Sequence, residues 1–205
     1  YNGTYPIPAG ATLGSPIQFN VTVGSGTSVT NVTLTNTASV STATAELSTS
    51  NNSGSVNITV TPRLSLQTDS GTANAGTAST AISDVRANDT INGTTATAAN
   101  STLATSGTWP TGLTLDTTSG AIQVAASVAP GTYSVDYQLC DKSTPANCKT
   151  MTDTVTVNAV ITPVTESGTA SAGTASTAIA NVAANDTVNG QPATLGATGN
   201  ATLAT

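Results

Sequence analysis

The chain has 205 residues, which is enough for one or two domains, and only 7% of them are charged, against roughly 25% in an average soluble domain. The net charge is −6 with four basic residues, so the clustered cations that a nucleic-acid partner requires are absent. No long apolar run occurs, so we expect no membrane span in this segment.

Alternating apolar and polar residues predict β-strands along the chain. The candidates in the first third are residues 17–23, 29–40 and 53–60. Turn signals such as Asn92-Gly93 and Pro130-Gly131 separate the candidates in the middle of the chain, which are 77–82, 95–99, 113–116, 121–125, 131–140 and 149–159. No helical period appears, so the sequence predicts an all-β fold.

The chain contains an internal repeat. The stretch DSGTANAGTASTAISDVRANDTING (69–93) matches ESGTASAGTASTAIANVAANDTVNG (166–190) at 19 of 25 positions, with an offset of 97 residues. A period near 97 is too long for a solenoid and suits β-sandwich domains of about 100 residues. The alternative is one compact protein with a coincidental duplication.

The repeat predicts three parts. Residues 1–66 would be the C-terminal part of a β-sandwich repeat, 67–163 a complete immunoglobulin-like repeat, and 164–205 the N-terminal part of a further copy. Residues 157–164, with Pro163, are expected to form a stiff linker between the last two parts. The sequence therefore predicts tandem sandwiches in an elongated array.

Two motifs resemble a known class of proteins. The stretch GTWPTGLTLDTTSGAIQ (107–123), followed by APGTYSVDYQL (129–139), resembles the immunoglobulin-like and cadherin-like repeats of large bacterial cell-surface proteins of the adhesin type. Residues 29–60 resemble the conserved bacterial cell-surface repeat domain. The resemblance departs from the usual pattern at Gln123-Val124, where the family has glycine and threonine. It implies an extracellular location on the cell surface.

The predicted core contains the only tryptophan. Small Thr and Ala side chains would leave a sandwich core thin without a large aromatic residue, which removes roughly 150–250 Å² from water. The alternative for Trp109 is an exposed platform for stacking a sugar. The residues expected in the core are Trp109, Leu113, Leu115, Ile122, Val135, Tyr137 and Leu139.

The repeated segment ANDT(I/V)NG has two interpretations. In the cadherin-like repeats a related Asn-Asp segment lies near calcium sites between domains, and this resemblance nominates Asn88, Asp89, Asn185 and Asp186 as calcium ligands. Calcium takes six to eight oxygen ligands, and each copy supplies one carboxylate. The simpler interpretation is an Asn/Asp turn that leads into an Asn-Gly hairpin. Apart from this calcium hypothesis we expect no cofactor.

The two cysteines, Cys140 and Cys148, flank a loop rich in turn residues. A zinc site needs about four ligands, and the chain has no histidine or further cysteine to complete one. A redox motif would have two intervening residues, where this chain has seven. An even cysteine count in a chain of secreted type favours a disulfide.

The sequence favours a structural role over catalysis. No carboxylate pair, nucleophile–base pair or metal cluster can be assembled from the spacing, so we expect no enzyme. The leading hypothesis is a segment of a bacterial surface fibre, stalk or adhesin shaft, with neighbouring repeats or copies of the same protein as partners. The alternatives are a self-assembling filament subunit with strand complementation between copies, and a module that binds host or surface glycans or proteins.

Overall fold

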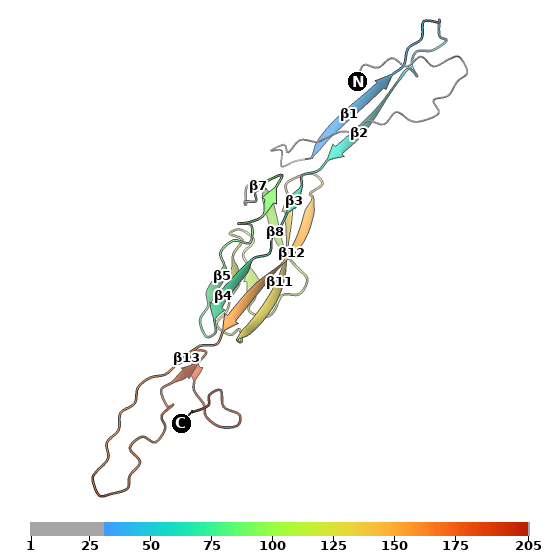
Figure 1. Ribbon diagram of the computed structural model, residues 1–205. Coiled ribbons are helices and arrows are strands. Elements are labelled where there is room, and N and C mark those ends of the chain that lie inside the picture. Colours follow the sequence, from blue (N-terminus) through green and yellow to red (C-terminus); the bar gives the residue numbers. More distant parts are fainter. Residues whose placement is uncertain (1–30, 205) are drawn as a thin grey trace.

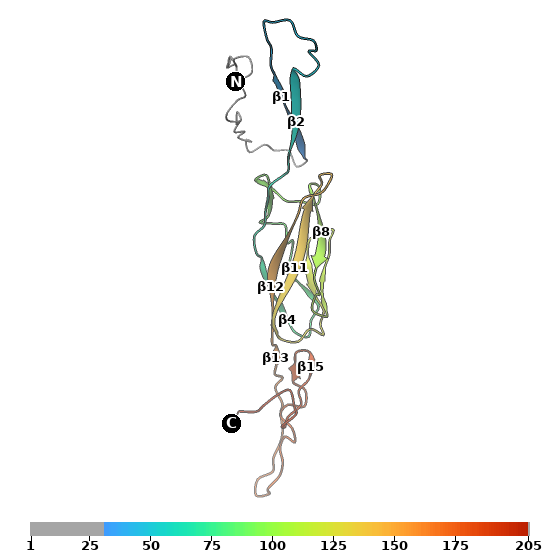
Figure 2. The same ribbon diagram turned by 90° about the vertical axis from the view of Figure 1, so that its right-hand side faces the viewer.

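The computed structural model describes residues 31–204, and every regular element in that range is a β-strand. The all-β fold class is thus confirmed. Figures 1 and 2 show three parts that follow one another in a row: an N-terminal hairpin, a central unit and a following unit. Within the described range no helix is long and apolar enough to cross a membrane. The strand expected at 17–23 lies outside the described residues.

The N-terminal hairpin consists of β1 (Val32–Ser39) and β2 (Ser53–Val60), which pair in antiparallel fashion from Val32 opposite Val60 to Ser39 opposite Ser53. The alternation of the sequence gives this ribbon two different faces. Threonines such as Thr33 and Thr35 lie on one face, and Val32 and Leu34 lie on the other with their cross-strand partners.

The central unit is a sandwich of two sheets with a third, small sheet at one end. Strand β4 runs parallel to β12, and the other pairs are antiparallel. The first sheet has the order β4 (Ser70–Asn74), β12 (Cys148–Asn158), β11 (Gly131–Asp141), β8 (Ser101–Ser106). The second has the order β5 (Ser79–Ile82), β10 (Ile122–Val124), β9 (Leu113–Leu115).

The longest hairpin, β11–β12, supplies most of one wall of the core. Its inward positions alternate along each strand, as a half-buried strand requires. Val135, Tyr137 and Leu139 of β11 are buried, as are Val155 and Val157 of β12. Strands β4 and β8 lie on either side of this hairpin and widen its sheet.

A small three-stranded sheet recurs in both units. In the central unit it is formed by β3 (Leu64–Ser65), β6 (Thr90–Ile91) and β7 (Thr94–Thr95). In the following unit it is formed by β13 (Ile161–Thr162), β14 (Thr187–Val188) and β15 (Gln191–Pro192). Each strand of the second set lies 97 residues after its counterpart in the first.

This pairing corrects the expected linker over 157–164. Strand β12 continues to Asn158, and Ile161–Thr162 pairs with β14, so only Ala159 and Val160 lie between the two units. In the same way, Leu64–Ser65 belongs to the sheet of the central unit. The connection between units is short because the first strand of each unit pairs directly with a strand of that unit's own Asn-Gly hairpin.

The core lies between the two sheets of the central unit. Of the expected core residues, Leu113, Ile122, Val135, Tyr137 and Leu139 are buried, while Trp109 and Leu115 are partly buried and pack against the cluster. The Trp109 indole donates a hydrogen bond to the Asp136 carbonyl, 2.8 Å away. The core also contains residues that the sequence pattern did not single out, among them Leu66, Val85, Ile91, Leu103, Val124, Val128, Val155 and Val157.

Candidate functional site

The Asn-Gly turn of the central unit holds the chain that enters the unit. Asn92 and Gly93 both have positive φ, 52° and 79°, which is the geometry of a two-residue hairpin turn. The Asn92 side chain accepts a hydrogen bond from the Arg63 backbone N–H at 2.7 Å, and the Asn92 N–H donates to the Arg63 carbonyl at 2.9 Å. These two bonds fix the linker residue to the turn.

Asp89, which precedes Asn92 in the chain, makes the second attachment to the entering chain. Its side chain is fully buried, with 0% of its surface exposed. One carboxylate oxygen accepts from the Gln67 N–H at 2.8 Å, and the other accepts from the Tyr137 hydroxyl at 2.6 Å. Asp89 therefore links the entering strand to β11 in the core. We call Asn92 and Asp89, with their backbone partners Arg63 and Gln67, the entry anchor.

The following unit has the same entry anchor. Asn189 accepts from the Val160 N–H at 2.8 Å and donates its own N–H to the Val160 carbonyl at 2.7 Å. Asp186 accepts from the Val164 N–H at 2.6 Å. All four residues lie 97 positions after their counterparts, so the repeated letters of the sequence correspond to repeated hydrogen bonds.

The candidate calcium ligands lie within these anchors. Both Asp89 oxygens accept hydrogen bonds, and the Asn88 amide donates to Asp69 at 2.8 Å. Among residues 31–204 no three His, Cys, Asp or Glu side chains group as a metal site would require. Asp89 does not fit as a ligand in this arrangement, because its oxygens are committed to other groups. Calcium binding at these residues is a hypothesis drawn from the sequence resemblance, and titration tests it.

Three carboxyl groups of the central unit, those of Asp69, Asp89 and Asp153, lie close enough to act on one another electrostatically. Asp153 of β12 is fully buried, and one of its oxygens accepts from the Asp69 N–H at 2.8 Å. The other oxygen of Asp153 and one oxygen of Asp69 have no hydrogen-bond partner. Burial, together with the negative charges of Asp69 and Asp89, raises the pKa of Asp153 to about 7. The pKa values of Asp69 and Asp89 are also raised, first by burial.

Cys140 and Cys148 stand directly opposite each other on β11 and β12, and a disulfide joins them. Beyond it, Asp141 organises the loop by accepting from the N–H groups of Ser143 at 2.9 Å and Asn147 at 3.0 Å. The Asn147 amide then donates to the Pro62 carbonyl at 2.7 Å. The disulfide loop thus contacts the chain that leads into the unit, close to the entry anchor.

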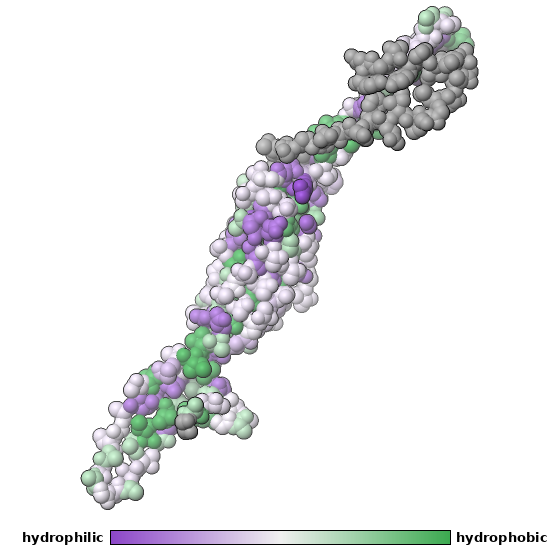
Figure 3. Space-filling model, in the orientation of Figure 1, coloured by the Kyte–Doolittle hydropathy of each residue, from purple (hydrophilic) through white to green (hydrophobic). Residues whose placement is uncertain are grey.

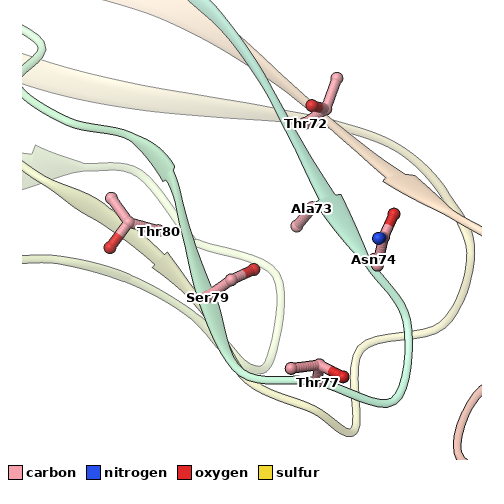
Figure 4. Close-up of a pocket in the computed structure, with 6 residues that line it drawn as sticks. All are labelled: Thr72, Ala73, Asn74, Thr77, Ser79 and Thr80. Carbon is pink, nitrogen blue, oxygen red and sulfur yellow. The ribbon is translucent and has the colours of Figure 1, made fainter.

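A groove of about 280 Å³ lies between β4 and β5. Figure 4 shows Ala73 and Ser79 directed into the space between the two strands, with Thr77 on the turn that connects them. The Ser79 hydroxyl has no hydrogen-bond partner. The lining contains no aromatic or charged side chain; it consists of Thr72, Ala73, Asn74, Thr77, Ser79 and Thr80. It therefore lacks the aromatic surface on which sugars stack.

No protein-family model matches the chain, and no curated protein matches its sequence. Among solved structures it is similar to Protocadherin Gamma B2 extracellular cadherin domains 3-6, with a TM-score of 0.35, 11% identity, and coverage of 52% of this chain and 29% of that one. For mouse cadherin-23 EC22-24 the TM-score is 0.36 and the identity 14%, with coverage of 63% of this chain and 42% of that one. For Drosophila N-cadherin EC1-3 the TM-score is 0.33 and the identity 14%, with coverage of 50% of this chain and 37% of that one.

The chain spans less than half the length of each of these proteins. At these TM-scores the likeness supports no statement about function, and we place the chain in no family because of it. The interpretation of the site rests on the described residues alone.

Proposed function

We propose that this chain is a structural, non-catalytic segment of an extracellular bacterial surface fibre, stalk or adhesin shaft, built from tandem β-sandwich units. The observation that supports this most strongly is the entry anchor, which occurs twice with the same three hydrogen bonds among four residues, at an offset of 97 residues. Each anchor fastens a unit to the chain that enters it. Such contacts maintain the spacing and connection of units along a row.

The disulfide loop supports the same proposal. Asn147 contacts Pro62, so the covalently closed loop braces the entrance of the central unit. A disulfide persists in an oxidising compartment, which agrees with an extracellular location. With 7% charged residues and four Lys and Arg in total, the chain also offers few cleavage sites to trypsin-like proteases.

Surface exposure on intact cells tests this proposal. Antibodies raised against residues 64–158 should label intact source cells, and protease added outside the cells should remove the label. Labelling that requires lysis of the cells would contradict the proposal. In the same sample, a native polypeptide far heavier than 20.0 kDa indicates a segment of a long array.

A second candidate is a filament subunit in which strands of one copy complete a unit of another. The N-terminal hairpin favours it, because Val56 and Ile58 of β2 are 56% and 43% exposed. Figure 3 shows further hydrophobic residues at the surface of the following unit. Val182 there is 44% exposed, whereas its counterpart Val85, whose carbonyl accepts from the Tyr137 hydroxyl, is fully buried.

Mass measurements distinguish the two candidates. A filament subunit predicts a native polypeptide near 20.0 kDa that forms oligomers, and substitution of Ile58 with a charged residue should dissociate them. A much heavier native chain, or a monomer at micromolar concentration, would exclude the filament subunit.

A further inference from the structure

Two turns from neighbouring units meet where the central unit ends. One is the turn between β4 and β5, at residues 75–78, and the other is the Asn189-Gly190 turn of the following unit. A Cβ on Gly76 would overlap the Asn189 carbonyl and lie 2.7 Å from the Gly190 nitrogen. A Cβ on Gly190 would lie 3.2 Å from both the Cα and the carbonyl oxygen of Gly76. The two backbones are therefore so close that a side chain on Gly76 would overlap the neighbouring turn, and one on Gly190 would be tightly crowded.

Hydrogen bonds tie both turns to the short linker. The Ala75 N–H donates to the carbonyl of Asn158, the last residue of β12, at 2.9 Å. On the other side, Asn189 holds Val160 by the two bonds of the entry anchor. Asn158 is therefore bonded to the β4–β5 turn, and Val160, two residues later, is bonded to the Asn189-Gly190 turn. The contact between Gly76 and Gly190 brings the two turns themselves together.

The same two turns also occur at places where their glycines meet no neighbouring unit within the described chain. Gly173 is the counterpart of Gly76, with φ of 81° against 84°, and Gly93 is the counterpart of Gly190, with φ of 79° against 74°. A Cβ on Gly173 or on Gly93 would meet no atom within 4 Å. At these two positions only the backbone conformation favours glycine. At Gly76 the neighbouring unit also requires it, and at Gly190 the neighbouring unit leaves little space for anything larger.

We propose that the β4–β5 turn is a docking surface for the Asn-Gly turn of the next unit, and that the contact between Gly76 and Gly190 fixes the orientation of successive units without any ligand. Units joined by a short linker normally move relative to one another unless their interface is extensive. Here two linker residues, the three hydrogen bonds just described and a glycine pair take the place of a large interface. The inference rests on the proposed tandem array and names the surface through which its units meet.

Residual dipolar couplings measured on the full chain test this joint. Gly76→Ala and Gly173→Ala introduce the same side chain at nearly the same positive φ, so their backbone strain is matched. Only Gly76→Ala creates an overlap with the neighbouring unit. We expect residues 64–158 and 161–204 to share one alignment tensor in the wild type and in Gly173→Ala, and to require two tensors in Gly76→Ala.

The pair Gly190→Ala and Gly93→Ala provides a second comparison if Gly76→Ala unfolds the central unit. Two tensors in the wild type, or equal behaviour within each pair of variants, would overturn the joint. Those results would leave the proposed surface array standing, since a flexible array is still displayed on the cell. Absence of the chain from the cell surface would overturn the proposed function and leave the joint intact.

Discussion

Asn189 and Val160 hold each other by two hydrogen bonds, with the Val160 N–H donating to the Asn189 side chain at 2.8 Å and the Asn189 N–H donating to the Val160 carbonyl at 2.7 Å. Arg63 and Asn92 make the same pair of bonds at the entrance of the central unit. A repeated sequence motif therefore corresponds to a repeated mechanical attachment, and its strength can be measured.

Replacing Asn92 with glycine should lower the free energy of unfolding of the central unit by about 1 kcal/mol, since one side-chain hydrogen bond to the backbone is lost. Glycine accepts the positive φ of 52°, so backbone strain does not contribute. Asn92→Asp keeps the acceptor oxygen and should remain close to the wild type. Urea denaturation followed by tryptophan fluorescence measures both. Equal losses in the two variants would contradict the role of the side-chain oxygen.

Removal of the disulfide should cost roughly 2–3 kcal/mol, because a short loop is released in the unfolded chain. The double variant Cys140→Ser with Cys148→Ser, compared with the oxidised wild type by denaturant titration, gives the value. Reduction of the wild type serves as the control and should match the double variant. Free thiols detected by alkylation of the denatured native protein would show that the bond does not form in its source.

The stability of the central unit should fall as the pH rises, because the folded pKa of Asp153 is about 7, well above its ordinary value of 3.8. The raised pKa means that the protonated carboxyl is favoured in the fold. Its contribution is complete below pH 3.8 and is lost progressively up to about pH 7. At about 1.4 kcal/mol per pKa unit, the rise from 3.8 to about 7 corresponds to a loss on the order of 4 kcal/mol.

The variant Asp153→Asn should flatten this pH profile and raise the melting temperature at pH 8. Asp136→Asn, where a half-buried carboxylate of the same hairpin accepts from the Thr152 hydroxyl at 2.6 Å, is the control for a change of carboxylate to amide away from Asp153. Thermal melts between pH 4 and 8 make the comparison. A wild-type melting temperature that rises with pH over this interval would contradict the assignment.

Tyr137→Phe should destabilise the central unit by about 1–3 kcal/mol at neutral pH, since the buried Asp89 would lose the partner of one oxygen. The hydroxyl of Tyr137 also lowers the pKa of Asp89, so the variant should shift Asp89 further toward the protonated form. The destabilisation is then expected to shrink at pH 4. Tyr133→Phe, whose hydroxyl donates to the carbonyl of nearby Ala129 on the chain leading into β11, is the matched control.

Calcium should leave the melting temperature unchanged, because the Asp89 oxygens already accept hydrogen bonds from Gln67 and Tyr137. Calorimetric titration and thermal melts with calcium or a chelator provide the readouts. Binding heat together with a rise in melting temperature would establish the calcium hypothesis and require Asp89 or Asp186 to exchange partners.

The sequence predicted the parts of the fold whose side chains alternate strongly. The expected strand at 53–60 coincides with β2, and those at 131–140 and 149–159 differ from β11 and β12 by one residue. Strand β4, with the sequence SGTAN, was missed because small residues give no alternation, and its conformation depends on parallel pairing with β12. The strand expected at 95–99 is wrong, since β7 ends at Thr95.

The candidate site was predictable only in its local part. An Asn/Asp turn before an Asn-Gly hairpin follows from short-range rules, and the Asn92-Gly93 turn has that geometry. The hydrogen bond between Asp89 and Tyr137 joins residues 48 positions apart in the sequence, and that between Asn147 and Pro62 joins residues 85 positions apart. Contacts so distant in sequence depend on how the sheets pack, which the pattern of side chains does not specify.

A cryo-electron microscopy map of the native assembly, isolated from its source, tests the proposed array most directly. We expect a row of β-sandwich units in which the central unit is continuous with a neighbour on each side. The junction between the central unit and the following unit should bring the β4–β5 turn against the Asn-Gly turn, as Gly76 lies against Gly190. A map in which this chain forms a separate compact particle, with no sandwich unit next to residues 64–158, would contradict the account.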